Sequence, residues 1–411
     1  MKRAVFILAA LVAGLLLGIT TGDSVPLLKD FADVVGTMWL NGLRMTVIPL
    51  VVALLVTGIL QTVDAASSGK LATRAILTML ILLWLVTIMA AIMTPALLAI
   101  IPMPAGAGDA LRNALGTIAP SEAPPPFGEF LKAMVPTNPV SAAANDSILP
   151  LIVFTLAFAF AATQLAPEKR LTIKQFFEAI AEAMVIVIGW VLLLAPLGVF
   201  ALGVVLGITA GASAFGALAH YVLIVTAIGT IIFLAAYLVA MFGAQFPLAD
   251  FVRAAIPAQA VAISTQSSLA SLPAMVQGAN QLGVGSRTTD IVLPIAVAIF
   301  RATSPAMNIA VALYIAHWMG VDLGVQEIAI GVAVAAITTL GSVSLPGSIS
   351  FIASVAPICL AMGVPIEPLG LLIAIETFPD IMRTLGNVTM DIAVTGTVGR
   401  AEGDVTSGDS V

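Results

Sequence analysis

The sequence predicts an all-α membrane protein with eight transmembrane helices and two re-entrant helical hairpins. Of the 411 residues, 60% are hydrophobic and only 9% are charged, whereas water-soluble domains carry about 25% charged residues. Long apolar stretches recur along the whole chain, and two of them are interrupted midway by small and polar residues. The 34 glycines and 24 prolines also fit, because membrane helices tolerate both residue types.

Eight stretches are apolar and long enough for a membrane crossing, which needs about 20 residues of helix. They cover Ala4–Thr20, Val34–Val63, Leu71–Ile101, Leu149–Leu165, Phe176–Leu206, Ala217–Phe242, Ile291–Met319 and Leu369–Val398. The first follows the basic pair Lys2-Arg3, as the apolar core of a secretory signal would. Its apolar run is long for a signal and lacks a clear small-x-small cleavage site, so we expect an uncleaved first helix.

Two further apolar stretches, roughly 248–282 and 328–362, do not read as simple spans. They are interrupted by SSLASLP at 267–273 and by GSVSLPGSIS at 341–350. Both interruptions are rich in serine and contain Leu-Pro. We interpret the stretches as two re-entrant hairpins of an inverted repeat, as found in secondary transporters. Two ordinary kinked helices are the alternative.

The positions of lysine and arginine predict the orientation, because positive charge stays on the cytoplasmic side. With the N-terminus inside, eight spans place most basic residues inside as well, and only Lys29, Arg112 and Lys132 outside. We therefore expect a protein of the cell (inner) membrane with both termini in the cytoplasm. Residues 104–126 would form an external loop, and 401–411 a disordered tail.

Composition also excludes several classes of protein. The net charge of −6 is scattered rather than gathered on one face, so no nucleic-acid partner is expected. One cysteine and two histidines exclude a disulfide framework and a metal site built from Cys or His. No HExxH or GxSxG motif occurs, so we expect neither an enzyme nor a bound cofactor.

The last predicted span carries an unusual polar stripe. Glu376, Asp380, Arg383, Asn387 and Asp391 follow one another at steps of 4, 3, 4 and 4 residues, which places them on one face of an α-helix. A charge inside a membrane costs at least about 2.5–3.5 kcal/mol. Fastening of the helix by ion pairs is one reading. The other reading is a cavity for a substrate. In it the arginine would bind a carboxylate, the aspartate at 380 would bind an ammonium group, and the asparagine would form hydrogen bonds.

The tips of the two hairpins would supply free backbone groups and helix ends for a substrate. We expect Ser267, Ser268, Ser344 and Gly347 to line the site, although serines also serve as packing residues in membrane helices.

Arg301 is a further charge near the middle of a span. It should therefore pair with a carboxylate, for which Asp391 and Asp380 are the candidates.

With these motifs in place, the chain resembles the dicarboxylate/amino acid:cation symporter family, the glutamate transporter homologues. The resemblance covers nearly the whole sequence and rests on MTVIPLVV (45–52), PTNP (136–139), APLGVFAL (195–202), STQSSLASLP and GSVSLPG. The last span matches best. The family pattern of an acidic residue, Asp, Arg-Thr, Asn and Asp occurs here with the same spacing, at Glu376, Asp380, Arg383-Thr384, Asn387 and Asp391.

The resemblance implies an elevator-type glutamate transporter fold and a homotrimer. Residues 1–70 and 106–212 would form a fixed scaffold, and 71–105 and 213–400 a moving transport domain. The resemblance also implies that Arg383 binds the side-chain carboxylate of an acidic amino acid and Asp380 its amino group. Thr384 and Asn387 would bind the backbone end, with Ser268 from the first hairpin and the tip of the second hairpin as the lid. Family members that carry dicarboxylates without an amino group tend to lack an acid at position 380, so aspartate or glutamate is expected over succinate or malate.

One motif departs from the family pattern. Where sodium-coupled members carry Asn-Met-Asp-Gly-Thr, this chain has Phe-Arg-Ala-Thr-Ser at 300–304, and ILLWLVTIMAA lacks the expected Thr-Ser pair. We hypothesise that the guanidinium of Arg301 occupies the position of the sodium ion, beside Asp391. Sodium is then not expected to drive transport. Proton symport through Glu376 or Asp391, or uncoupled uptake and exchange, would replace it. A sodium- or proton-coupled C4-dicarboxylate carrier and a channel remain as alternatives.

Overall fold

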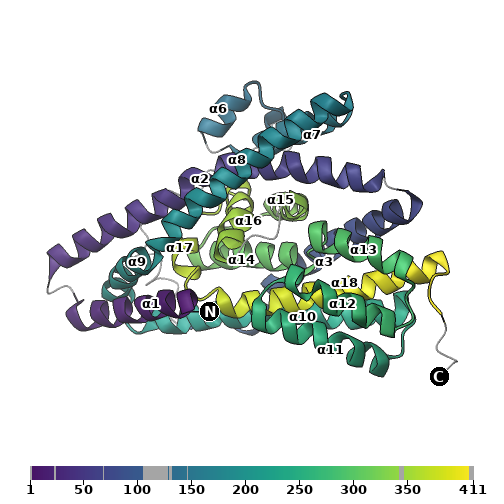
Figure 1. The fold of residues 1–411 in the computed structure, drawn as a ribbon. Coiled ribbons are helices and arrows are strands. Elements are labelled where there is room, and N and C mark those ends of the chain that lie inside the picture. Colours follow the sequence, from purple (N-terminus) through teal and green to yellow (C-terminus); the bar gives the residue numbers. More distant parts are fainter. Residues whose placement is uncertain are drawn as a thin grey trace.

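In the computed structural model of the chain, nearly all described residues are helical (Figure 1). The structure describes residues 2–22, 25–67, 69–104, 128, 132–145, 147–341 and 347–406, with the backbone alone at 2–4, 341 and 347–349. Among these residues, five segments are long and apolar enough to cross a membrane. They are Pro26–Ala66, Lys70–Ile100, Pro167–Leu193, Ser213–Gly243 and Ser286–Met319.

One group of packed helices occupies the left and top of Figure 1. It consists of α1 (Lys2–Thr21), α2 (Pro26–Ala66), α7 (Ile148–Thr163), α8 (Pro167–Leu193) and α9 (Ala195–Ala210), with the short α6 (Pro139–Ala144) against α7. The long α2 contacts α7, α8 and α9 and so connects the members of the group.

The contact between α1 and α9 depends on glycines spaced four residues apart, Gly14 and Gly18 on α1 and Gly203 and Gly207 on α9. A Cβ atom on Gly18 would collide with the backbone of α9, and a Cβ atom on Gly207 with that of α1. Small residues at this spacing allow membrane helices to approach closely. The first predicted span therefore packs into the protein through its backbone.

The second group fills the centre and right of Figure 1. Its members are α3 (Lys70–Ile100), α10 (Ser213–Leu238) with a π-helical turn at Val239–Gly243, α11 (Leu248–Thr265), α12 (Ser268–Gln281), α13 (Ser286–Ile299), α14 (Thr303–Met319), α15 (Val325–Gly341), α16 (Gly347–Ala361), α17 (Pro368–Leu372) and α18 (Thr377–Glu402). Helix α18 contacts α3 and each of α10 to α14. The polar stripe therefore lies inside a bundle of helices.

The two groups meet where α15 and α16 lie against α2. At this contact Nη1 of Arg44, on α2, is 2.9 Å from Oε1 of Glu367, which directly precedes α17. Both side chains are partly exposed, at 42% and 33%. The pair joins residues 323 positions apart in the chain.

Helices α11 and α12 form a helical hairpin, and α15 packs against α16 in the same manner. The first turn is made at Gln266, whose φ of +53° is left-handed, and Ser267 caps α12 by accepting a hydrogen bond from the Ala270 amide (3.2 Å). The serine-rich stretch is therefore mostly the first turn of α12. The connection at 342–346 lies outside the described residues, and the re-entrant character of both hairpins stays a prediction.

Three of the predicted spans are interrupted. The span 176–206 divides into α8 and α9 at Leu194, just before Pro196, which has no amide N–H to continue the helical hydrogen bonds. The span 291–319 breaks at 300–302, between α13 and α14. The span 369–398 divides into α17 and α18, so that Glu376 precedes the long helix instead of lying within it.

The expected disordered tail is wrong for residues 401–406. Helix α18 continues to Glu402, and the next residues lie along the connection between α12 and α13. The Gly285 amide donates to the carbonyl oxygen of Asp404 (2.9 Å), and the Thr406 amide to that of Gly283 (3.0 Å). Residues 407–411 lie outside the described part of the chain, as does nearly all of the predicted external loop at 104–126.

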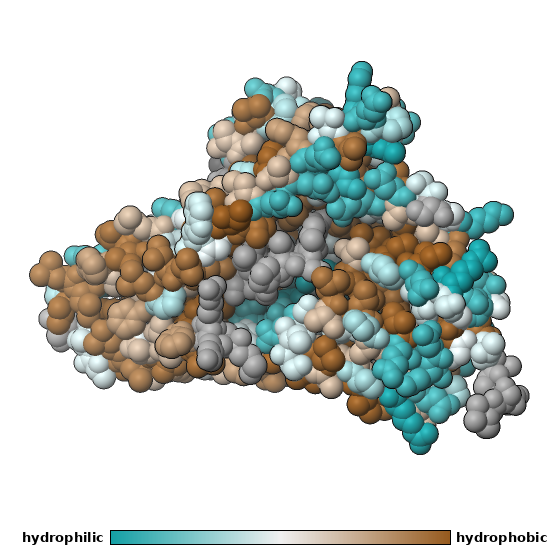
Figure 2. Space-filling model, in the orientation of Figure 1, coloured by the Kyte–Doolittle hydropathy of each residue, from teal (hydrophilic) through white to brown (hydrophobic). Residues whose placement is uncertain are grey.

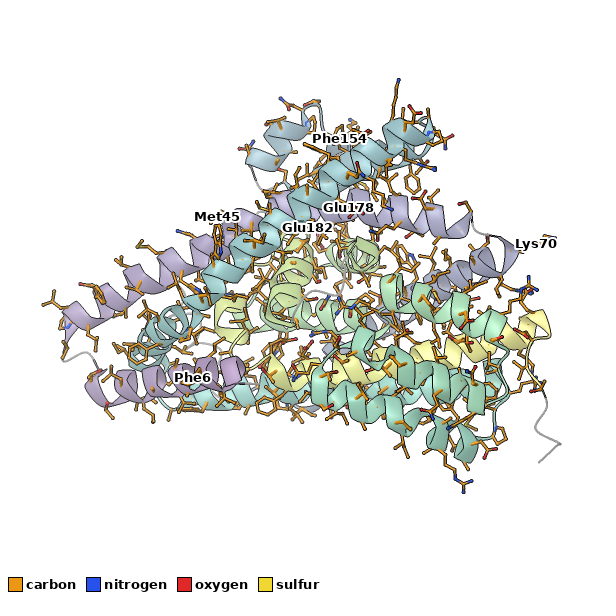
Figure 3. All side chains as sticks on the ribbon, viewed as in Figure 1. Phe6, Met45, Lys70, Phe154, Glu178 and Glu182 are labelled. Carbon is orange, nitrogen blue, oxygen red and sulfur yellow. The ribbon has the colours of Figure 1, made fainter. Side chains whose placement is uncertain are left out.

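The molecular surface is strongly apolar over the first group. In Figure 2 hydrophobic residues cover the arm built from α1 and α2, and hydrophilic residues gather towards the opposite end. Phe6 and Met45 are 69% and 62% exposed and Phe154 is 41% exposed, on α1, α2 and α7 (Figure 3). Large exposed apolar faces of this kind suit contact with lipid or with another protein.

Candidate functional site

The centre of the site is the break between α13 and α14, which places the start of α14 against α18. The Thr303 amide donates to Oδ1 of Asn387 (2.8 Å), and the Thr303 hydroxyl donates to the carbonyl oxygen of Arg383 (2.5 Å) and also contacts Oδ1 of Asn387. Gly386 makes room, because a Cβ atom there would collide with the Thr303 methyl group. Asn387 therefore satisfies one of the free amides at the N-terminus of α14.

Arg383 is the most strongly held charge of the site. Its Nη1 lies 2.7 Å from Oε1 of Glu376 and 3.0 Å from Oδ1 of Asp380, and all three residues are buried. The Tyr221 hydroxyl, on α10, donates to Oε2 of Glu376 (2.8 Å). Both carboxylates therefore act on one nitrogen of the guanidinium.

The opposite edge of the same guanidinium is open. Nε and Nη2 of Arg383 are buried and have no hydrogen-bond partner among the residues that the structure describes. The N–H bonds of these two nitrogens lie in the guanidinium plane along one edge, and such an edge can bind a carboxylate with two parallel hydrogen bonds. Buried donors without partners are uncommon in proteins. The arrangement is suited to an incoming carboxylate.

Asp391 forms a second charged centre two turns further along α18. It is fully buried, and neither carboxylate oxygen has a hydrogen-bond partner within the described chain. Arg301, in the break before α14, attracts Asp391 and Asp380 electrostatically. Its Nη1 also donates to Oγ of Ser350 on α16 (3.3 Å). Arg301 therefore interacts both with the carboxylates of α18 and with α16 of the second hairpin.

The other predicted site residues have the following places. The Thr384 hydroxyl donates to the Asp380 carbonyl oxygen within α18 (3.0 Å). Ser267 and Ser268 stand at the start of α12, which packs against α18, and Gly347 begins α16. Ser344 lies outside the described residues. Contact between these residues and a substrate stays a prediction. The same holds for substrate binding by Asn387.

Sequence reasoning missed several residues of the site. Tyr221 was not considered, although a tyrosine hydroxyl inside a membrane helix needs a hydrogen-bond partner. Thr303 and Ser304 were read only as replacements in a sodium motif, but both contact Asn387 (Nδ2 to Ser304 Oγ 3.5 Å). Ser350 belongs to the second serine-rich motif and could have been found from it.

The site carries three carboxylates, Glu376, Asp380 and Asp391, and two guanidinium groups, Arg301 and Arg383. If all five are ionised, the sum is −1. Over the described residues no group of three His, Cys, Asp or Glu side chains is placed to hold a metal ion. The fixed charges and hydrogen-bonding groups of the site are suited to recognition of a charged organic molecule.

Comparison with known proteins gives consistent matches over the whole chain. The profile of the "Sodium:dicarboxylate symporter family" matches residues 4–401. The "Proton/sodium-glutamate symport protein" of Bacillus subtilis (strain 168) is 28% identical over 403 residues, which cover 95% of this chain and 91% of the relative. The "Proton/glutamate-aspartate symporter" of Escherichia coli (strain K12) is 28% identical over 93% of this chain and 89% of the relative. The "C4-dicarboxylate transport protein 1" of Pseudomonas aeruginosa (strain UCBPP-PA14) is 24% identical over 98% and 89%.

Proposed function

Because the chain belongs to the sodium:dicarboxylate symporter family, we propose that it is a secondary active transporter of aspartate or glutamate and that it works without sodium. Membership itself establishes a coarser statement: the chain is an integral membrane transporter of dicarboxylates or amino acids, and not an enzyme. The finer statement depends on the contacts around α18.

The observation that carries the proposal is the open edge of Arg383. A carboxylate of the substrate would bind there with two charge-assisted hydrogen bonds. Because the five ionisable groups of the site sum to −1, a substrate that brings an ammonium group along with two carboxylates suits it better than a dianion. Asp380, which lies 3.0 Å from Nη1 of Arg383, is the carboxylate that would attract the ammonium group. The relatives named for glutamate and aspartate support the same class of substrate.

Independence from sodium is proposed from the pair Arg301 and Asp391. A buried carboxylate without hydrogen bonds needs a compensating positive charge. A mobile cation could supply it; in this chain the guanidinium of Arg301, which attracts Asp391 electrostatically, would take that place. Transport would then be driven by a proton gradient, with Glu376 or Asp391 as protonated groups, or would proceed by exchange.

The two packing groups support an elevator mechanism. Residues 1–70 and 106–212 would form the scaffold, and 71–105 and 213–400 the domain that carries the substrate. The half-exposed ion pair between Arg44 and Glu367 crosses the boundary and would break and re-form as the domain moves. The apolar outer faces of α1 and α2 support contact with lipid and assembly as a homotrimer. Both termini would be cytoplasmic, in the cell (inner) membrane.

A second candidate is a C4-dicarboxylate carrier coupled to sodium or protons. The Pseudomonas relative of that name favours it, and so does the direct contact of Asp380 with Arg383 (3.0 Å), because an aspartate held in this way is less available to an ammonium group. Competition separates the two. Excess unlabelled succinate should leave uptake of labelled aspartate almost unchanged, and strong inhibition would favour the dicarboxylate carrier.

The test of the proposal is uptake of labelled aspartate into proteoliposomes under separately imposed sodium and proton gradients. We expect the rate to be unchanged when choline replaces sodium at equal ionic strength. A large decrease without sodium would refute sodium independence while leaving the carrier intact. Counterflow, in which internal unlabelled aspartate accelerates entry of label, is the control that separates a carrier from a channel.

A further inference from the structure

A buried histidine, His220, lies on α10 where the ends of α3 and α14 meet it. The residue is 6% exposed. Its Nε2 is 2.8 Å from the carbonyl oxygen of Ile101, directly after α3, and its Nδ1 is 3.0 Å from the Tyr314 hydroxyl on α14. The Tyr314 hydroxyl is also 3.0 Å from the carbonyl oxygen of Ala217, one turn earlier on α10. Both ring nitrogens therefore have partners.

These contacts determine where protons can reside. A carbonyl oxygen only accepts hydrogen bonds, so Nε2 carries a hydrogen that it donates to Ile101. In neutral imidazole, Nδ1 then accepts from the Tyr314 hydroxyl. In imidazolium, Nδ1–H donates to the tyrosine oxygen, and the hydroxyl hydrogen turns to the Ala217 carbonyl. Both charge states are fully hydrogen-bonded at the same heavy-atom positions, and only one hydroxyl hydrogen rotates between them.

His220 is also connected to the substrate site. The ring of Tyr314 packs edge-on against that of Tyr221 with centroids 5.3 Å apart, and Tyr221 donates to Glu376 (2.8 Å). Glu376 in turn pairs with Arg383. The titratable groups around the imidazole are therefore Tyr314 and Tyr221, with the Glu376–Arg383 pair beyond them. His317, one turn further along α14, is exposed.

The geometry points to His220 as a proton-binding site of the carrier, coupled to the Glu376–Arg383 pair through Tyr314 and Tyr221. The inference rests on the proposed transport function and names His220, in place of Glu376 or Asp391, as the group that takes the coupled proton. Imidazole exchanges protons readily near neutral pH. A proton added at Nδ1 places a positive charge beside Tyr314, whose ring packs against that of Tyr221. It attracts Glu376 and weakens the hold of Glu376 on Arg383, which then becomes available to the substrate carboxylate.

His220→Gln is the variant that tests this inference, because glutamine retains a donor of similar reach and cannot be protonated. His317→Gln is the matched control, since the chain has only two histidines. Aspartate uptake and counterflow are measured in the same proteoliposomes with and without an imposed pH gradient. A gradient of about one unit drives at most about ten-fold accumulation per coupled proton. We expect His220→Gln to lose that accumulation and to retain counterflow only with a weakened apparent affinity for aspartate, because Glu376 then keeps its hold on Arg383, while His317→Gln behaves like the wild type.

The outcomes are separable. Accumulation by His220→Gln equal to that of the wild type overturns the inference. A wild type that shows counterflow but no response to the pH gradient also overturns it, while the proposed carrier function stands. A wild type without aspartate counterflow refutes the proposed function itself.

Nitrogen NMR of the histidine-labelled carrier provides a measurement that does not depend on transport or on the folding of a variant. Two ring systems are expected, and the spectrum of His317→Gln identifies the signals of His220. The inference predicts that the neutral ring of His220 converts to the imidazolium state, with a hydrogen on both nitrogens, as the pH is lowered over the range in which the pH gradient drives uptake. A ring that stays neutral over this range overturns it. In Tyr314→Phe, which removes the rotating hydroxyl, the conversion should shift in pH.

Discussion

Replacing Arg301 by methionine would remove a partly buried positive charge and leave Asp391 without its attraction. Asp391 is fully buried, and its oxygens have no hydrogen-bond partners in the described chain, so the arginine is its main source of stabilisation. Removing one partner of a buried charge pair typically destabilises a protein by about 3–5 kcal/mol. We expect a loss of this size for Arg301→Met, measured by thermal unfolding of the purified protein in detergent.

The double variant Arg301→Met with Asp391→Asn provides the comparison that isolates the pair. Because it removes both charges, its stability should return to within about 1 kcal/mol of the wild type, a coupling energy of about 3 kcal/mol or more. Equal losses in the single and double variants would show that Arg301 stabilises the protein through other contacts, such as its hydrogen bond to Ser350.

The same single variant tests whether a guanidinium occupies the place of a cation. With the arginine gone, sodium can compensate Asp391. Sodium at ten times its dissociation constant should then stabilise Arg301→Met by about 1.4 kcal/mol. Choline at equal ionic strength is the control. Equal stabilisation of the wild type by sodium, or none in the variant, would refute the reasoning.

Three further predictions concern other parts of the structure. Arg383→Lys keeps the charge but loses the open two-nitrogen edge, so aspartate affinity should fall by about 1.5–3 kcal/mol, roughly 10- to 150-fold; unchanged affinity in a binding titration would argue against a carboxylate there. Asp404→Ala removes the acceptor for the Thr288 amide and hydroxyl (3.2 and 2.7 Å) and should lower stability by about 0.5–2 kcal/mol in thermal unfolding, whereas Asp404→Asn should retain most of it. Gly207→Val should separate α9 from α1, because its Cβ would meet the Leu15 carbonyl; we expect poor yield and a lowered unfolding temperature. Gly189→Val is the control, because a Cβ atom there would meet no atom within 4 Å.

The sequence predicted best what depends on local periodicity. The stripe on α18 follows from its spacing alone, and Asp380 to Asp391 do face the interior of the bundle. Glu376 does not belong to the same helix as the rest of the stripe, because α17 ends before it and a turn follows. No proline or glycine marks that turn between Leu372 and Thr377. Long apolar helices were found for the same reason, since hydrophobicity over about 20 residues is a strong signal.

What the sequence could not predict depends on partners that are distant in the chain. The break at 300–302 is stabilised by Asn387, 84 positions from Thr303. Its local signal is Pro305 in the first turn of α14, which cannot donate a hydrogen bond to the carbonyl of Arg301. The contacts of His220 likewise come from Ile101 and Tyr314, 119 and 94 positions away. Single-sequence patterns carry no record of such pairings.

The segment 403–406, which lies along the connection between α12 and α13, has a practical consequence for expression of this protein. Asp404 caps the first turn of α13, and the other end of that helix leads into Phe300 and Arg301. A truncation before residue 404 would therefore destabilise the start of α13. It would also disturb the charged site, which lies at the other end of this helix. Purification tags and fluorescent fusions belong after residue 406, behind a spacer, if measured affinities are to represent the intact carrier.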